Sequence, residues 1–108
     1  MNSINKTNLI DKATYYRTIQ LLLSYKDLKH SALLNGVDSD VKVMIDRGIS
    51  LLEDEPYINI IKQYYFEGVT METIANEMNI HVSVAYRNRR RLLKRLSIIF
   101  FGDQSINK

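Results

Sequence analysis

The fold is decided by one stretch of sequence, YINIIKQYYFEGVTMETIANEMNIHVSVAYRNRRRLLKRLSIIFF, which runs from Tyr57 to Phe101. It is broken at Gly68 and at Asn79, and both residue types tolerate the left-handed backbone that closes a helix. Between the breaks, Thr70 is placed to cap a short helix from about Met71 to Met78. A short helix, a tight turn and a longer helix are the layout of a helix-turn-helix, and this is the arrangement that we predict.

The longer helix, predicted from about Val82 past Leu96, has two opposite faces. At about 100° per residue, the apolar stripe holds Ala85, Leu92, Leu96 and Ile99, and the opposite stripe holds Ser83, Arg87, Arg90 and Lys94. Residues 81–96 contain six Lys and Arg and no Asp or Glu, whereas the net charge of the whole chain is only +3. This local excess favours an anionic partner. Arg89 and Arg95 lie outside this cationic stripe. We expect them to be solvated or to pair with Glu67, Glu72 or Glu77.

An apolar back and a cationic front suit a helix that enters the major groove, because guanidinium groups can fork onto guanine or phosphate. Residues near the start of such a helix reach base edges, and later residues meet the backbone. We therefore expect bases to be contacted by Ser83, Val84 and Arg87. The expected phosphate contacts are Tyr86, Arg90, Arg91 and Lys94, together with Thr70 and the free N–H groups that follow it.

These residues carry a resemblance to a known family. The elements YYFEGVTMETIANEMNI and RNRRRLLKRL, within residues 58–96, resemble the region-4 helix-turn-helix of sigma-70-type factors. They are most similar to the small phage-encoded transcriptional activators of the ArpU/RinA type. The resemblance covers a little over a third of the chain and implies promoter binding, with RNA polymerase as a further partner. The sequence departs from the family pattern at Asn79, where Gly is commonest, at His81, where Ser or Thr often caps the recognition helix, and at Asn88.

The first half of the chain is also predicted to be helical. Apolar residues recur at helical intervals from about Asn8 to Leu34, and Thr7 or Asp11 is placed to cap this segment. The inward positions should be Leu9, Ala13, Tyr16, Ile19, Leu23 and Leu33, with Leu22 and Leu28 alongside.

The turn cluster of residues 35–40 precedes a second helix, predicted from about Asp40 to Leu52, with Ser39 or Asp40 as its cap. We expect close helix packing at Gly48, and burial of Val41, Met44 or Ile45, Ile49 and Leu52. A third helix, Tyr57 to Glu67, follows Pro56. No run alternates with a period of two, so the predicted fold is all-α with about five helices. It comprises an N-terminal helical pair (1–54), a helix-turn-helix region (55–102) and a flexible tail (103–108).

Composition excludes several classes. The 108 residues are 45% hydrophobic and 25% charged, as in an ordinary globular domain, and Cys is absent, which removes disulfides and thiolate metal sites. Of the two histidines, we expect His81 to be a cap or a surface residue. The longest apolar run, Ile98 to Phe101, is far shorter than the roughly 20 residues of a membrane span. No nucleophile, base and orienting residue form a catalytic set. We expect a cytoplasmic protein that is not an enzyme and uses no metal or cofactor.

Two function classes stay open. The first is a transcription regulator that binds double-stranded DNA. The second is a protein-interaction or assembly module with the same fold, such as a phage packaging small subunit or an RNA-polymerase-binding adaptor. The second class is motivated by the acidic run Glu53–Glu55 and by the apolar run Ile98–Gly102. The apolar run is explained by packing on the N-terminal helices or by a homodimer seam. We favour self-association, because a single module buries little surface on DNA.

Overall fold

The computed structural model describes residues 10–107, and its regular structure is helical apart from one isolated β-bridge. The elements are α1 (Lys12–Asn35), α2 (Asp40–Ser50), α3 (Ile58–Ile61) with its π-helical continuation η2 (Lys62–Phe66), α4 (Met71–Glu77), α5 (Val82–Phe101) and the 3-10 turn η3 (Gly102–Ser105). The predicted all-α fold of about five helices is therefore confirmed.

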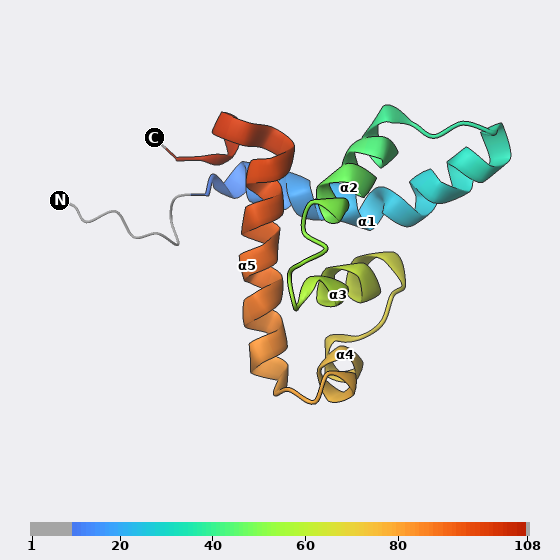
Figure 1. Cartoon of the computed structure of the whole chain (residues 1–108). Coiled ribbons are helices and arrows are strands. Elements are labelled where there is room, and N and C mark those ends of the chain that lie inside the picture. Colours follow the sequence, from blue (N-terminus) through green and yellow to red (C-terminus); the bar gives the residue numbers. More distant parts are fainter. Residues whose placement is uncertain (1–9, 108) are drawn as a thin grey trace.

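Helix α5 is the element against which the others pack. It contacts α1, α2, α3, α4 and η3. In Figure 1, α4 lies at the amino end of α5, α1 crosses α5 closer to its carboxyl end, and the α1–α2 hairpin projects to one side. The helix-turn-helix region and the N-terminal pair thus meet along a single helix.

Local side-chain caps set where the helices begin, much as the sequence predicts. Asp11 accepts the Thr14 N–H at 2.9 Å, Ser39 accepts the Lys42 N–H at 3.1 Å, and Thr70 accepts the Thr73 N–H at 3.2 Å. These bonds satisfy backbone donors that have no partner within the first turn of a helix. The alternative cap Thr7 lies outside the described residues.

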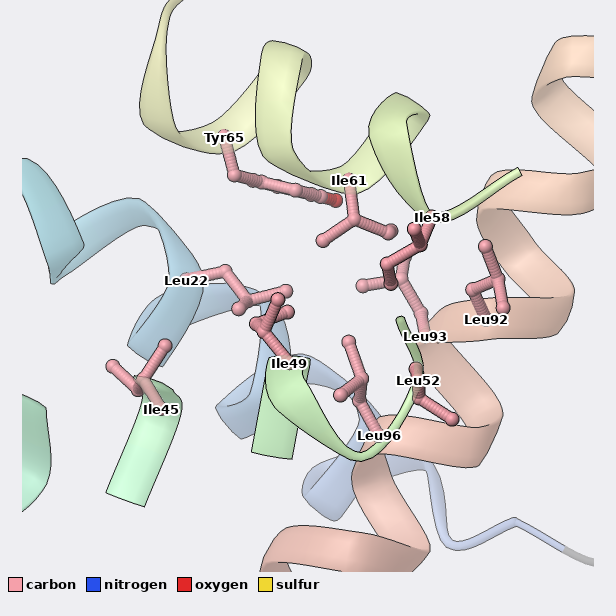
Figure 2. Packing of buried hydrophobic residues seen from close by; sticks show 10 residues of the cluster. All are labelled: Leu22, Ile45, Ile49, Leu52, Ile58, Ile61, Tyr65, Leu92, Leu93 and Leu96. Atoms are coloured by element: carbon pink, nitrogen blue, oxygen red, sulfur yellow. The ribbon is translucent and has the colours of Figure 1, made fainter. Parts of the chain in front are cut away.

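One hydrophobic cluster joins the two halves of the chain. Figure 2 shows side chains from α1, α2, α3, η2 and α5, together with Leu52, meeting at its centre. Its buried members are Leu22, Ile45, Ile49, Leu52, Ile58, Ile61, Tyr65, Leu92, Leu93 and Leu96. A second cluster, Ile60, Met71, Ile74, Ala75 and Ala85, holds α3, α4 and α5 together. The division at residue 54 therefore separates elements that share a core.

The inward face of α1 differs from the predicted one. Tyr16, Leu23 and Leu33 are exposed, whereas the buried residues are Thr14, Thr18 and Leu22. Ile19 and Leu28 are half-buried against the core, and Leu9 lies outside the described residues. Threonine can be buried here because its hydroxyl has hydrogen-bond partners. Thr18 Oγ1 lies within hydrogen-bond distance of the Thr14 carbonyl, at 3.0 Å, and of Ser97 Oγ, at 2.8 Å.

Helix α2 buries Ile45 rather than Met44 at the first core position, followed by Ile49, while Val41 stays exposed. Gly48 is buried where α2 crosses the end of α5, and a Cβ at this position would overlap the ring of Phe100. The close packing predicted at this glycine is therefore confirmed. The ring of Phe100 on α5 thus packs directly against α2 at Gly48.

The chain after α5 is packed where the sequence predicts a flexible tail at 103–108. Residues 102–105 form η3, and Ser105 is fully buried. The Ser105 carbonyl accepts the Asp11 N–H at 2.6 Å, and Ile106 pairs with Ile10 in the β-bridge. A backbone donor at the start of α1 thus finds its acceptor in this segment and holds it in place.

The hydroxyl pair of Thr18 and Ser97 links α1 to α5 and can be tested by a double-mutant cycle. The two hydroxyls share one interhelical hydrogen bond, so removing either hydroxyl breaks it. Each hydroxyl also bonds to the carbonyl four residues before it in its own helix. We expect Thr18→Val and Ser97→Ala to show a coupling of about 1 kcal/mol in the free energy of unfolding. Urea denaturation of both single variants and the double variant measures it. Strictly additive effects would contradict this assignment.

Candidate nucleic-acid interface

The turn between α4 and α5 sets the position of the candidate site. Asn79 has a φ of 58°, the only positive φ of a non-glycine among the described residues, and Gly68 closes the preceding helical segment at a φ of 71°. After the turn, the Ile80 N–H donates to the Ala75 carbonyl at 3.0 Å. His81 then caps α5 by accepting the Ser83 N–H at Nδ1. The left-handed turn at Asn79 and the capping role of His81 are thus as predicted.

Helix α5 has the two faces that its sequence predicts. Ala85, Leu92 and Leu96 have no exposed surface, and Ile99 is half-buried. On the opposite side Ser83, Arg87 and Arg90 are exposed and Lys94 is half-exposed. Within residues 10–107, the side chains of Arg87, Arg90 and Lys94 form neither a hydrogen bond nor an ion pair. These three cations therefore face solvent without an acidic neighbour.

The neutral candidates lie around the same end of α5. Ser83 Oγ is 2.8 Å from Nδ1 of His81, and Thr70 Oγ1 is engaged in capping α4. Val84 is half-buried, and Tyr86 is partly exposed. Ser83, Tyr86, Arg87 and Arg90 line one shallow depression, so the structure brings these four predicted residues together. Thr70, on the preceding loop, is not among them.

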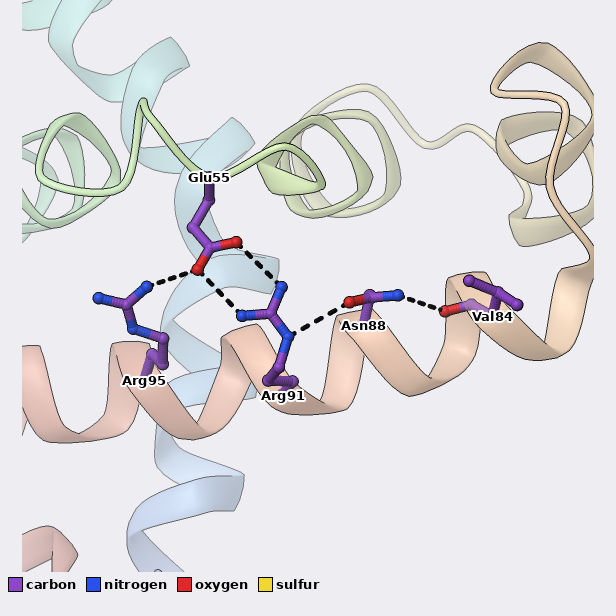
Figure 3. Close-up of polar contacts among 5 residues, drawn as sticks. All are labelled: Glu55, Val84, Asn88, Arg91 and Arg95. Atoms are coloured by element: carbon purple, nitrogen blue, oxygen red, sulfur yellow. Dashed lines mark hydrogen bonds and ion pairs between the residues drawn. The ribbon is translucent and has the colours of Figure 1, made fainter.

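Arg91 pairs with a carboxylate of the chain itself, although the sequence predicts it as a phosphate contact, and its side chain remains 44% exposed. Figure 3 shows its guanidinium facing Glu55, with both N–H···O distances at 2.9 Å. Arg95 donates to the same carboxylate at 2.5 Å, and not to the acids that we expected. Arg91 Nε also donates to Asn88, whose side-chain amide donates to the Val84 carbonyl. Arg91 therefore has partners within the chain, and its contact with phosphate stays a prediction.

The carboxylate of Glu55 ties the segment before α3 to the middle of α5. Its side chain is only 15% exposed. The hydrogen bonds from Arg91, followed by the single bond from Arg95, lower the pKa of Glu55 from 4.5 to about 2. A bidentate bond from arginine to a carboxylate fixes geometry as well as charge. The Glu55 contact therefore sets how α3 and α5 sit relative to each other.

Arg89 is a third arginine with a structural role. Its guanidinium lies 4.8 Å from the ring centre of Tyr64 and 5.0 Å from that of Tyr86. Such cation–π contacts stabilise a charge next to aromatic faces. Of the six cations of residues 81–96, three thus contact other parts of the protein: Arg89, Arg91 and Arg95. The cations of this stretch that form no hydrogen bond or ion pair among the described residues and contact no aromatic ring there are the other three, Arg87, Arg90 and Lys94.

Over residues 10–107 there is no group of three or more His, Asp or Glu side chains placed to hold a metal ion. Over the same residues, every helix is too short or too polar to cross a membrane.

Comparison with known proteins adds no family: the chain matches no protein-family model, no curated protein and no solved structure. The resemblance of residues 58–96 to sigma region 4 and to phage activators therefore stays a prediction from the residues themselves.

The Glu55 contact predicts a pH-dependent stability. Because the pKa of Glu55 is lower in the folded chain than its ordinary 4.5, its contribution is full above pH 4.5 and is lost as the pH falls toward about 2. We expect Glu55→Gln to destabilise the protein most above pH 4.5. The difference from wild type should shrink between pH 4.5 and 2, as measured by denaturant unfolding at several pH values.

Glu67→Gln is the matched control, since Glu67 is exposed and forms no ion pair among the described residues. A difference between wild type and Glu55→Gln that stays constant over this pH range would show that the ionised carboxylate does not contribute.

Proposed function

We propose that the chain is a sequence-specific DNA-binding transcription regulator whose helix α5 enters the major groove. One observation carries this proposal: a helix with a fully buried back at Ala85, Leu92 and Leu96 presents Arg87, Arg90 and Lys94 to solvent. The groove is wide enough for an α-helix, and arginine is its commonest guanine-binding side chain. A rigidly anchored helix supports such recognition, because base contacts require fixed donor positions.

The position of a residue along α5 determines whether it is proposed to contact bases or phosphates. Ser83, Val84 and Arg87 lie in the first two turns and are proposed to contact bases, whereas Arg90 and Lys94 follow toward the carboxyl end. At 1.5 Å per residue, Lys94 lies roughly 10 Å beyond Arg87, close to the major-groove width of about 12 Å. Lys94 therefore suits the phosphate backbone at the edge of the groove. Thr70 and Tyr86 are proposed as further phosphate contacts.

The finer proposal is a phage-type activator that binds promoter DNA and also contacts RNA polymerase in the cytoplasm. It rests on the resemblance of residues 58–96 alone.

An assembly module of the same fold is the second candidate. Its structural support lies at the tip of the α1–α2 hairpin and not in the acidic and apolar runs. Glu53 pairs with Lys62 and Glu55 pairs with Arg91, so these acids of the run have internal partners. Ile99 and Phe100 of the apolar run pack against the core, whereas Ile98 is exposed. What favours a protein partner is the tip of the α1–α2 hairpin, where large apolar side chains are 68–85% exposed: Leu33, Leu34 and Val37. Light scattering measures whether the chain forms a ring in the absence of DNA. Such a ring, together with no preference for any duplex sequence, favours assembly.

The DNA proposal is tested by selecting a binding site from random duplexes and titrating the selected duplex. We expect Arg87→Ala to weaken binding by about 1–3 kcal/mol and to blur base preference at one position. The logarithm of the wild-type affinity should fall with the logarithm of salt by about 0.9 per phosphate neutralised.

Arg47→Ala is the matched control, because Arg47 is an exposed arginine on α2 without an ion pair among the described residues. The proposal fails if no sequence is enriched in the selection, or if wild-type binding does not respond to salt.

A further inference from the structure

The start of α1 and the middle of α5 enclose a groove that the helix-turn-helix layout does not explain. The groove has a volume of about 360 Å³. Its charged and aromatic walls are Lys12, Tyr15 and Tyr16 from α1, and Arg90 and Lys94 from α5. Arg90 also lines the depression beside Ser83 and Arg87. The groove is therefore continuous with the outward face that is proposed to contact DNA.

The segment after α5 builds this groove by holding the start of α1 in place. The Asp11 N–H donates to the Ser105 carbonyl at 2.6 Å, and Thr14 Oγ1 lies 3.1 Å from the Gln104 carbonyl. Figure 1 shows the beginning of α1 and the end of the chain side by side, next to the carboxyl end of α5. Lys12 is thereby kept on the side of α5 where Arg90 and Lys94 lie.

The groove carries unbalanced positive charge. Lys12, Arg90 and Lys94 have no ion pair among the described residues. The neighbouring acid, Asp11, is turned into the cap of its own helix, where its carboxylate accepts the N–H of Thr14 at 2.9 Å and the hydroxyl at 2.8 Å. Tyr15 is half-buried beside these cations, and Tyr16 is exposed. The three cations and the hydroxyl of Tyr15 are hydrogen-bond donors suited to a phosphate group.

We propose that this groove binds a phosphodiester of the DNA backbone, on the strand that borders the major groove entered by α5. The inference rests on the proposed function and gives α1 a direct contact with DNA. Lys12 is its distinguishing residue, because it lies outside the helix-turn-helix and more than 70 residues before Arg87 in sequence. In this arrangement Arg87 sets base preference, and the groove adds affinity that is independent of sequence.

The test compares Lys12→Gln with Lys29→Gln on the selected duplex and on a scrambled duplex. Both lysines are exposed on α1, but Lys29 lies roughly 25 Å further along the helix. We expect Lys12→Gln to weaken binding to both duplexes by the same factor. Its salt slope should be lower by about 0.9, so its deficit should shrink by roughly 3.5-fold between about 50 and 200 mM salt. Lys29→Gln should match wild type.

Ethylation interference locates the contact. A phosphate that flanks the contacted bases should matter for wild type and for Lys29→Gln, and should no longer matter for Lys12→Gln. If Lys12→Gln keeps the wild-type slope while Arg87→Ala loses base preference, the groove proposal is overturned and the DNA-binding function stands. If wild type binds neither duplex in a salt-dependent way, both proposals fail together.

Discussion

The whole architecture depends on the burial of one side of α5 from its first turn to its last. Ala85 packs with α3 and α4, Leu92 and Leu96 lie in the main cluster, and Phe100 meets Gly48 of α2. A helix that is covered along one side over its full length has only the opposite side to offer a partner. The hydrophobic effect thus both stabilises the fold and decides which side chains of α5 face solvent.

The carboxylate of Glu55 then determines which cations of α5 have an ion-pair partner within the chain. Arg91 and Arg95 are one helical turn apart, so a single acid can accept from both. Arg87 and Arg90 form no ion pair among the described residues and keep their donors for a partner. Pairing two guanidinium groups with one carboxylate also lowers the mutual repulsion of six neighbouring charges. The acid therefore contributes to stability, and it engages two of the six cations while Arg87, Arg90 and Lys94 keep no ion pair among the described residues.

What the sequence predicts well is local. The caps at Ser39 and Thr70, the left-handed turn at Asn79 and the two faces of α5 each depend on residues within a few positions of one another. The features that the sequence does not predict depend on partners far along the chain. Thr18 is buried because Ser97 meets its hydroxyl, and Arg91 is engaged because Glu55, 36 residues earlier, is folded onto it. A hydropathy pattern counts threonine as polar and arginine as free, and no short-range signal corrects either.

The π-helical turn η2 explains why the N-terminal pair and α5 keep one relative orientation. Three consecutive aromatic residues leave it in different directions. Tyr64 faces Arg89 on α5, Tyr65 enters the core, and Phe66 stacks on Tyr25 of α1 with ring centres 4.1 Å apart. A wider turn than that of an α-helix changes the angle between successive side chains, which lets one segment contact both partners. Because α1 is fixed to α5 here and again at η3, the spacing between the groove cations and Arg87 is a property of the fold.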